Sequence, residues 1–547
     1  MTSKDWRKSV VYQIYPKSFN DTTGSGQGDI RGIIEKLDYF KFLGVDYLWL
    51  TPVYKSPMND NGYDISDYYE INPDFGTKED LKELLDQAQD KGIKIMMDIV
   101  INHTSTSHNW FVESKKSRDN EYRDYYIWKD GTYDAPPTNW ESKFGGNAWT
   151  YDDDTNQYYL RLFDVTQADL NWENEEVRRK IYDMINYWID FGVDGFRFDV
   201  INLISKGEFK DADGPGKEFY TDGPKVHEYI KELNLETFGG KDIMTVGEMS
   251  STTIEHCLKY TRPERNELNS VFTFHHLKVD YPGGEKWALA DFDFLQLKRI
   301  LMEWQEAMDQ GGGWNAIFWC NHDQPRVVSR FGSDATEEDR VLSSKMLAIA
   351  LHGLKGTPYI YQGEEIGMTN PGFTRIDQYC DVESLNAYTS MREKGMSIDL
   401  VMRILASKSR DNSRTPMQWN DSKHAGFTEG YPWIEVADNY GTINVEKALE
   451  DKNSILYTYR DLIRLRHEKD VLTYGDVRPH LMGDDDLFVY ERLYEGERIT
   501  VIANFRNKAV EYPPDVERGG EVLISNYDKT AEVLRPFEAL MIYGQDS

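Results

Sequence analysis

The feature that most constrains the fold of this chain is an alternation of short apolar segments with amphipathic helical ones. Helical periodicity covers residues 78–91 and 175–191, and each segment ends at a glycine, Gly92 or Gly192, just before an apolar run. A helix that ends at glycine and leads into a strand is the connection typical of a parallel sheet. Eight strands are expected, at residues 10–19, 45–54, 93–103, 193–200, 243–248, 270–276, 316–323 and 358–363. Eight strand–helix units predict an α/β fold, a (β/α)8 barrel, rather than a doubly wound sheet. A dinucleotide-binding fold is disfavoured because no GxGxxG turn follows the first strand.

Two segments interrupt this alternation. Residues 104–170 are polar and aromatic, and structureless loops of that length are uncommon, so we expect an inserted small domain after strand three. From about residue 472 short alternating strands replace the helical pattern, which predicts a C-terminal antiparallel β-sandwich. Its strands are expected at residues 487–493, 499–505, 521–525 and 539–543. The predicted domains are therefore the barrel (1–103 and 171–471), the inserted domain (104–170) and the sandwich (472–547).

Composition excludes several classes of partner and location. The net charge is −31, which argues against nucleic acid and anionic membranes, since both reward basic surfaces. No stretch approaches the roughly 20 apolar residues of a membrane span, and the N-terminus MTSKDWRKSVVYQIY lacks the apolar run of a signal peptide. The 3 cysteines lie far apart and form neither a disulfide framework nor a metal-ligand cluster. We therefore expect reduced thiols and a cytoplasmic protein.

The stretch GVDGFRFDVIN, residues 192–202, ends one of the predicted strands with charged groups. Side chains alternate between the two faces of a strand, so Arg197 and Asp199 share one face. A guanidinium in that position would keep the carboxylate ionised and oriented, as a nucleophile requires. From these residues alone a purely structural buried ion pair explains the pattern equally well.

The ends of other strands favour the catalytic interpretation. In (β/α)8 enzymes the active site lies at the C-terminal ends of the strands. Those ends carry Asp98, His103, Arg197, Asp199, Glu248, His322 and Asp323. Packing alone does not explain so many titratable groups, because an unpaired buried charge is costly. Carboxylates without a metal-ligand cluster indicate glycoside hydrolysis, in which one attacks the anomeric carbon and another protonates the leaving oxygen.

Four motifs resemble the signature regions of the α-amylase superfamily, glycoside hydrolase family 13. They are DIVINH (98–103), GFRFDV (195–200), TVGE (245–248) and NHD (321–323). The resemblance implies that this chain is a retaining glycoside hydrolase. VVYQIYPKSF, NDNGYDI, QADLNWEN, GTPYIYQGEEIGMTN and SRDNSRTPMQW resemble the branch of oligo-1,6-glucosidases and dextran glucosidases. FHHLKVDYPGGEKW and YTDGPKVHEY are similar to the members of that branch that act on trehalose 6-phosphate.

The resemblance implies a role for each matching residue. Asp199 would be the nucleophile, Glu248 the general acid/base, and Asp323 the carboxylate that binds sugar hydroxyls and stabilises the transition state. Asp98 would be structural support below the site. The residues implied to line the subsite of the released glucose are Asp60, Tyr63, His103, Arg197, His322 and Arg410. Arg414 lies in the same motif as Arg410, so the choice between the two rests on resemblance alone.

A calcium site is not expected. Relatives often bind calcium after strand one through a D-x-N-x-D-x-x-x-D run of oxygen ligands. Here the run reads DTTGSGQGD, so Thr23 and Ser25 occupy the third and fifth positions and remove charge that a hard cation needs. We therefore expect weak calcium binding or none, and no other metal or cofactor.

A basic cluster after strand six suggests a sugar phosphate as the substrate. His275, His276, Lys278 and Lys286 could supply charge-assisted hydrogen bonds to a phosphate dianion. Without the resemblance, solvated lysines and packed histidines would be the simpler interpretation. With it, the leading hypothesis is hydrolysis of trehalose 6-phosphate to glucose and glucose 6-phosphate. The alternative is an oligo-1,6-glucosidase or dextran glucosidase acting on isomaltose-type ends. A non-catalytic transporter partner is disfavoured, because such proteins lose the catalytic carboxylates.

Overall fold

The computed structural model describes residues 5–514, 516, 519–529 and 531–545. The first four residues of the N-terminal stretch considered above, and the last two of the predicted sandwich, lie outside the described part. Within it, no helix combines the length and the apolar character needed to cross a membrane. Cys257, Cys320 and Cys380 are free thiols.

The chain divides into two compact units. The first comprises Met1–Leu48, Gln87–Ile93 and His275–Ser547, and the second comprises Trp49–Asp86 and Lys94–Phe274. Strand β2 (Tyr47–Leu50) begins in the first unit and ends in the second. The two units are described in turn below.

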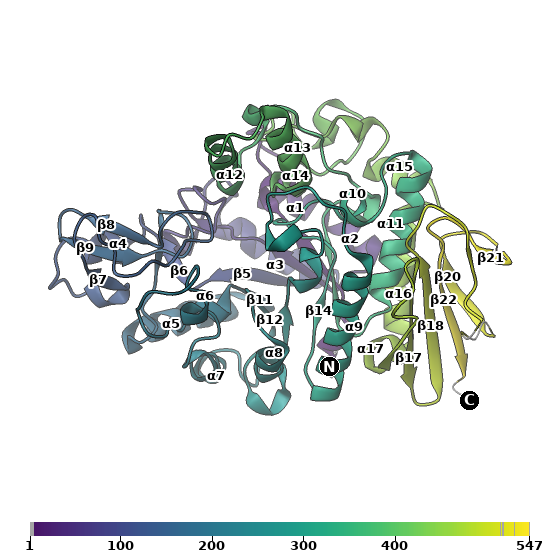
Figure 1. Cartoon of the computed structure of the whole chain (residues 1–547), viewed down its shortest axis with the longest axis horizontal. Helices are drawn as coiled ribbons and strands as arrows, with labels where there is room; N and C mark the ends of the chain where they lie inside the picture. Colours follow the sequence, from purple (N-terminus) through teal and green to yellow (C-terminus); the bar gives the residue numbers. More distant parts are fainter. Residues whose placement is uncertain (1–4, 515, 517–518, 530, 546–547) are drawn as a thin grey trace. The chain divides into compact units, whose positions relative to one another are not determined.

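The strands of the parallel sheet follow the order β13-β12-β11-β5-β2-β1-β15-β14. The second unit holds β5 (Lys94–Val100), β11 (Gly195–Asp199), β12 (Met244–Glu248) and β13 (Ser270–Phe272). The first unit holds β1 (Val11–Ile14), β14 (Ala316–Ile317) and β15 (Thr357–Tyr361). Figure 1 shows β5, β11 and β12 side by side. All eight predicted strands are confirmed, and most are shorter than their apolar runs.

Helix α5 (Glu175–Phe191) places the strand that carries Arg197 and Asp199. It begins at Asn174, whose side chain accepts a hydrogen bond from the Glu176 amide at 2.9 Å. It ends at Gly192, which has φ 116° and thus reverses the chain in a conformation that side chains with a Cβ avoid. One face of α5 is buried, as its amphipathic pattern predicts, and it includes Val177, Ile181, Ile185 and Trp188. The second unit also contains α4 (Asn109–Ser114), α6 (Lys217–Tyr220), α7 (Val226–Glu236) and α8 (Ile254–Thr261), and most of α3 (Lys78–Asp90).

The segment inserted after β5 has its own small sheets. Strands β7 (Trp128–Asp130), β9 (Gln157–Leu160) and β8 (Trp149–Asp152) form one antiparallel sheet in that order, beside α4 in Figure 1. Strands β6 (His103–Ser105) and β10 (Gln167–Asp169) form another. A separate pair, β3 (Tyr54–Lys55) and β4 (Asp67–Ile71), precedes β5 in the chain. The aromatic core of the insertion, which includes Trp140 and Phe163, also takes in Val200, Leu203 and Tyr220. The insertion therefore packs on the chain that follows Asp199.

The first unit ends in an antiparallel sheet of order β16-β17-β18-β22-β20. Its strands are β16 (Asp476–His480), β17 (Leu487–Tyr494), β18 (Glu497–Asn504), β20 (Glu521–Ser525) and β22 (Ala539–Gln545). The four predicted strands are confirmed. Strand β16 was not predicted because Pro479 breaks its pattern; proline is tolerated there because β16 is an edge strand. A short pair, β19 (Val510–Glu511) and β21 (Val533–Leu534), accompanies this sheet.

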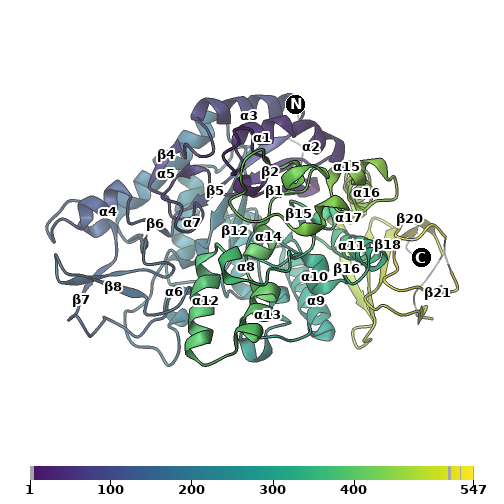
Figure 2. The same cartoon turned by 90° about the horizontal axis from the view of Figure 1, so that it is seen from above.

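Helices fill most of the rest of the first unit. After β15 the chain forms α12 (Val382–Glu393) and α13 (Ile398–Lys408), which lie side by side in Figures 1 and 2. The remaining helices are α1 (Ile30–Glu35), α2 (Leu37–Leu43), α9 (Phe294–Gly311), α10 (Val327–Phe331), α11 (Glu337–His352), α14 (Asp411–Arg414), α15 (Val445–Glu450), α16 (Ile455–Glu468) and α17 (Asp470–Tyr474).

Candidate active site

Arg197 is the centre of the candidate site in the second unit. Its Nη1 lies 2.7 Å from Asp98 Oδ1 and 2.8 Å from Asp199 Oδ1, and its Nη2 contacts Glu248 Oε2. The Arg197 side chain is 1% exposed, so these contacts occur away from bulk water. One guanidinium thus holds three carboxylates that come from three neighbouring strands.

The strand register explains this convergence. Arg197 lies opposite Asp98 on β5 and opposite Val246 on β12. Asp199 and Glu248 are the last residues of their strands, so both carboxylates sit at the same edge of the sheet. Because both carboxylates contact one guanidinium, they lie close together. Retaining glycosidases need such proximity, since their two catalytic carboxyl groups are about 5 Å apart.

The three carboxyl groups around Arg197 share one positive charge. Burial alone would lower the pKa of Arg197, but Asp98, Tyr63 and Asp199 raise it above its usual value. The cation is therefore permanent, and it can neutralise only one of the three carboxylates. Burial raises the pKa of Asp98, although Arg197 counteracts this effect, so one guanidinium does not fully compensate the three carboxyl groups.

Asp98 supports the side chains of Arg197 and Tyr63. Its carboxylate is fully buried and accepts hydrogen bonds from Tyr63 Oη at 3.0 Å and Trp49 Nε1 at 3.2 Å, in addition to Arg197. These donors fix both oxygens, so Asp98 orients Arg197 and Tyr63 rather than facing a substrate.

Three predicted sugar-binding residues meet around Gln167. Gln167 Nε2 donates to Asp60 Oδ2 at 3.0 Å and lies 3.3 Å from both the Tyr63 carbonyl and His103 Nε2. His103 Nε2 is also 3.2 Å from the Tyr63 carbonyl. Burial lowers the pKa of His103 to about 4, so its imidazole is neutral near pH 7. Gln167 was not among the predicted site residues, although it opens the QADLNWEN motif.

A buried lysine behind His103 was also missed. Lys206 Nζ is 2.7 Å from Asp169 Oδ2 and 2.8 Å from Asn102 Oδ1. Asn102 Nδ2 in turn lies 3.1 Å from His103 Nδ1. The ammonium therefore neutralises Asp169 and fixes the amide that orients His103.

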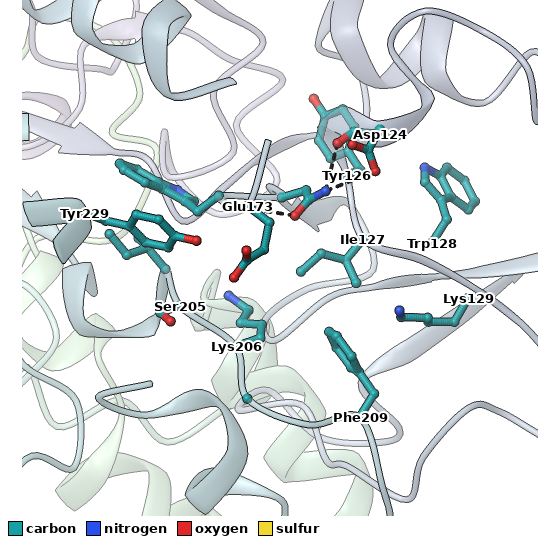
Figure 3. A pocket seen from close by; sticks show the side chains of 14 residues that line it. Asp124, Tyr126, Ile127, Trp128, Lys129, Glu173, Ser205, Lys206, Phe209 and Tyr229 are labelled. Atoms are coloured by element: carbon teal, nitrogen blue, oxygen red, sulfur yellow. Dashed lines mark hydrogen bonds between the residues drawn. The ribbon is translucent and has the colours of Figure 1, made fainter. Parts of the chain in front are cut away.

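A cavity of about 300 Å³ opens beside Lys206 (Figure 3). Of the described residues that line it, none belongs to the predicted site. Its wall mixes aromatic and polar side chains, including Trp128, Asn171, Glu173, Lys206, Phe209 and Tyr229. The catalytic carboxylates thus do not lie in this cavity.

The first unit holds a second group of predicted residues, around Asp323. Asp323 Oδ1 is 2.7 Å from Arg414 Nη2 and 3.4 Å from Arg410 Nη1. Its Oδ2 lies 3.4 Å from His322 Nε2, and His322 Nδ1 is 2.7 Å from Gln13 Nε2. The structure therefore brings Asp323, His322 and Arg410 together, as expected for one subsite.

The two arginines of the SRDNSRTPMQW motif have different surroundings. Arg414 also donates from Nε to the His322 carbonyl at 2.9 Å, and it is 1% exposed. Arg410 instead binds Asp381 Oδ1 through Nη2 at 2.5 Å and reaches Asp323 only at the longer distance. Arg414 thus supports the main chain and carboxylate of the NHD motif, and Arg410 is the more loosely held of the two at Asp323.

The four predicted phosphate-binding residues also differ in their surroundings. His276 is buried, its Nε2 lies 2.9 Å from the Phe318 carbonyl, and burial lowers its pKa to about 4. The ring of His275 packs against Trp304 at 5.0 Å. Lys278 is exposed, whereas Lys286 Nζ lies 2.6 Å from Glu383.

The carboxylates in the loop after β1 bind the chain's own donors. Asp21 accepts hydrogen bonds from the Thr23 amide at 2.9 Å, the Gly26 amide at 2.7 Å and Thr428 Oγ1 at 2.5 Å. Asp29 caps α1 by accepting from the Gly32 amide at 2.7 Å. Donors of the chain itself thus bind both acidic residues that end the run DTTGSGQGD.

Residues 13–475 match the family model described as "Alpha amylase, catalytic domain". The chain belongs to the alpha-amylase family, which confirms the family and the barrel fold class expected from the sequence. It is 57% identical to a trehalose-6-phosphate hydrolase of Bacillus subtilis, over 98% of this chain and 97% of the relative. It is 50% identical to an oligo-1,6-glucosidase of Bacillus cereus, over 99% of each chain. A crystal structure of trehalose-6-phosphate hydrolase from Bacillus licheniformis superposes with a TM-score of 0.94 at 57% identity and covers 99% of this chain and 100% of that one.

Proposed function

We propose that this chain is a retaining glycoside hydrolase that cleaves the α,α-1,1 bond of trehalose 6-phosphate into glucose and glucose 6-phosphate. The observation that carries the chemistry is the placement of Asp199 and Glu248 at adjacent strand ends on one guanidinium. The 57% identity to a trehalose-6-phosphate hydrolase, against 50% to an oligo-1,6-glucosidase, favours the predicted substrate over the predicted alternative.

The reaction has two displacements. Asp199, kept ionised by Arg197, attacks the anomeric carbon while Glu248 protonates the leaving oxygen of glucose 6-phosphate. Glu248 then removes a proton from water, whose oxygen attacks the anomeric carbon and breaks its bond to Asp199, so that glucose leaves with its α-configuration retained. Sharing one cation suits this exchange, because Glu248 gains and loses a proton beside a charge that does not change.

Sugar recognition is assigned to the polar residues that the sequence resemblance implies. Asp323 binds hydroxyl groups of the glucose and stabilises the oxocarbenium-like transition state. Asp60, His103, His322 and Arg410 hold the other hydroxyl groups, and Tyr63 stacks under the ring. The neutral state of His103 suits a hydrogen-bonding role rather than a charged one.

Phosphate recognition is assigned to the segment after β13. Lys278 and Lys286 supply the positive charge, in a chain whose net charge of −31 discourages anions elsewhere. His276 is buried and its pKa is lowered, so it shapes the base of the segment and carries no charge to the phosphate. His275 packs on Trp304 and completes that base.

The proposed enzyme needs no metal, because its own donors bind Asp21 and Asp29 and because Thr23 and Ser25 replace the other calcium ligands. We place it in the cytoplasm, because its few, widely spaced cysteines fit a reducing compartment. The domain boundaries at residues 103/104, 170/171 and 471/472 likewise stay predictions.

The direct test is a comparison of substrates. Purified protein is incubated separately with trehalose 6-phosphate, trehalose and isomaltose, and glucose release is measured. We expect the highest kcat/KM on trehalose 6-phosphate. A higher value on isomaltose would favour the oligo-1,6-glucosidase alternative instead.

A further inference from the structure

Lys286 is held by one acidic residue. Both carboxylate oxygens of Glu383 contact Lys286 Nζ, at 2.8 and 2.6 Å. The Lys286 side chain is 23% exposed and that of Glu383 is 16% exposed, so solvent screens this pair less than it would a surface pair. Lys286 Nζ also lies 4.8 Å from the centre of the Trp287 ring. The ammonium thus has a defined position although lysine side chains are flexible.

Glu383 is itself fixed. It lies in the first turn of α12, where the helix dipole favours a negative charge. Its Oε2 also lies 3.4 Å from Arg410 Nε, and Arg410 is held by Asp381, the N-cap of α12. The carboxylate thus joins Lys286 to the arginine that contacts Asp323.

The chain before Lys286 is anchored as well. Asp280 is 5% exposed, and its carboxylate lies 2.6 Å from Arg330 Nη2 and 2.5 Å from Lys408 Nζ. Two cations therefore hold the segment after β13 at Asp280, and Glu383 holds its far end at Lys286. An ammonium has three donor hydrogens, and two Glu383 oxygens leave it capacity for another acceptor.

We propose that Glu383 is a specificity-determining positioning residue, which holds the Lys286 ammonium in place for the phosphate of the substrate. The inference rests on the proposed function, because it requires a phosphorylated sugar. Glu383 acts through Lys286. Because the lysine side chain is already ordered, phosphate binding does not include the entropic cost of ordering it. The uncharged amide of glutamine, with nearly the same shape, would hold the ammonium only weakly.

The test is a double-mutant cycle with two substrates. Glu383→Gln, Lys286→Met and the double variant are assayed on trehalose 6-phosphate and on a neutral aryl α-glucoside. In Glu383→Gln we expect KM for trehalose 6-phosphate to rise about tenfold with kcat within about twofold. The ratio of kcat/KM between the two substrates should fall by a similar factor. In the Lys286→Met background the added Glu383→Gln change should have no further effect on that ratio.

Two variants guard the interpretation. Glu393→Gln removes the same charge from the exposed end of α12 and should leave both activities unchanged. Glu383→Asp keeps the charge but moves it away from Lys286 by one methylene, so its increase in KM for trehalose 6-phosphate should be smaller. This variant also replaces Glu383→Gln in the test if that variant does not fold.

The outcomes separate the two hypotheses. The losses in kcat/KM could multiply in the double variant, or they could be equal on both substrates. Either outcome would show that Glu383 acts through Arg410 or on the sugar. It would overturn this inference and leave the proposed function standing. The same holds if the wild type prefers trehalose 6-phosphate and Glu383→Gln has no effect. A wild type without that preference would overturn the proposed function and this inference together.

Discussion

At the scale of single residues, Arg197 determines what the site can do. Its guanidinium contacts the proposed nucleophile, the proposed acid/base and a supporting carboxylate, while its own side chain is almost fully buried. A buried ion pair alone would need one carboxylate. The presence of three is the reason to prefer the catalytic interpretation that the sequence left open.

Replacing Asp199 with asparagine should abolish nearly all turnover and leave folding largely intact, because an amide of similar shape cannot attack the anomeric carbon. Turnover on trehalose 6-phosphate and the thermal unfolding midpoint would both be measured. Near-normal activity in a folded Asp199→Asn variant would remove Asp199 from the role of nucleophile.

Glu248→Gln should affect substrates according to their leaving groups. Turnover of a sugar leaving group should fall far more than that of an activated aryl glucoside, whose departure needs no proton. Added azide should partly restore turnover of the aryl substrate, since a small anion can attack the glycosyl-enzyme without a general base. Equal losses on both substrates with no response to azide would contradict the assignment.

At the scale of elements, the turn from α5 to β11 places the nucleophile. Gly192 has φ 116°, and a Cβ there would meet only Leu85 Cδ1, at an ordinary 3.8 Å, so the backbone angle alone demands glycine. The strand that starts three residues later carries both Arg197 and Asp199.

Gly192→Ala should therefore lower the free energy of unfolding by about 1–2 kcal/mol, the cost of a left-handed conformation for a residue with a Cβ. The control is Gly441→Ala, at a glycine where a Cβ meets nothing within 4 Å and φ lies outside the left-handed region. Unfolding midpoints of the two variants would be compared. Equal midpoints would show that the backbone at Gly192 relaxes without cost.

The elements also show what the sequence could and could not predict. The eight parallel strands and α5 were predictable because their periodicity is local. Strand β16 was missed because Pro479 hides its pattern. Gln167, Lys206 and Glu383 were missed because their partners lie far away in the sequence, as Lys206 and Asn102 do, and no local pattern records such pairs.

At the scale of the whole molecule, buried neutral histidines link stability to pH. Burial lowers the pKa of His103 and His276 to about 4, and that of His108 and His352 to about 3. In the unfolded chain a histidine has a pKa near 6.5, so the unfolded state binds more protons as the pH falls. Their stabilising contribution is present above about pH 6.5 and is lost as the pH falls toward 4 and 3.

We therefore expect the thermal unfolding midpoint to be clearly lower at pH 5 than at pH 7, with a loss on the order of 2 kcal/mol in the free energy of unfolding. Buried carboxyl groups act in the opposite direction: burial raises the pKa of Glu364 to about 8 and that of Asp411 to about 6, and it also raises the pKa of Asp64, Asp98 and Glu365. The expected decrease therefore requires that the four histidines outweigh these carboxyl groups between pH 7 and pH 5. A midpoint at pH 5 equal to or above that at pH 7 would show that the carboxyl groups dominate in this range.

The central claim, retaining hydrolysis of trehalose 6-phosphate, is tested most directly by following the reaction with proton nuclear magnetic resonance. The anomeric signals are recorded within the first turnovers, before mutarotation mixes them. We predict equal amounts of glucose and glucose 6-phosphate, with the first glucose in the α-form. First-formed β-glucose would contradict the double displacement through Asp199, and intact trehalose 6-phosphate under conditions where isomaltose is cleaved would contradict the proposed substrate.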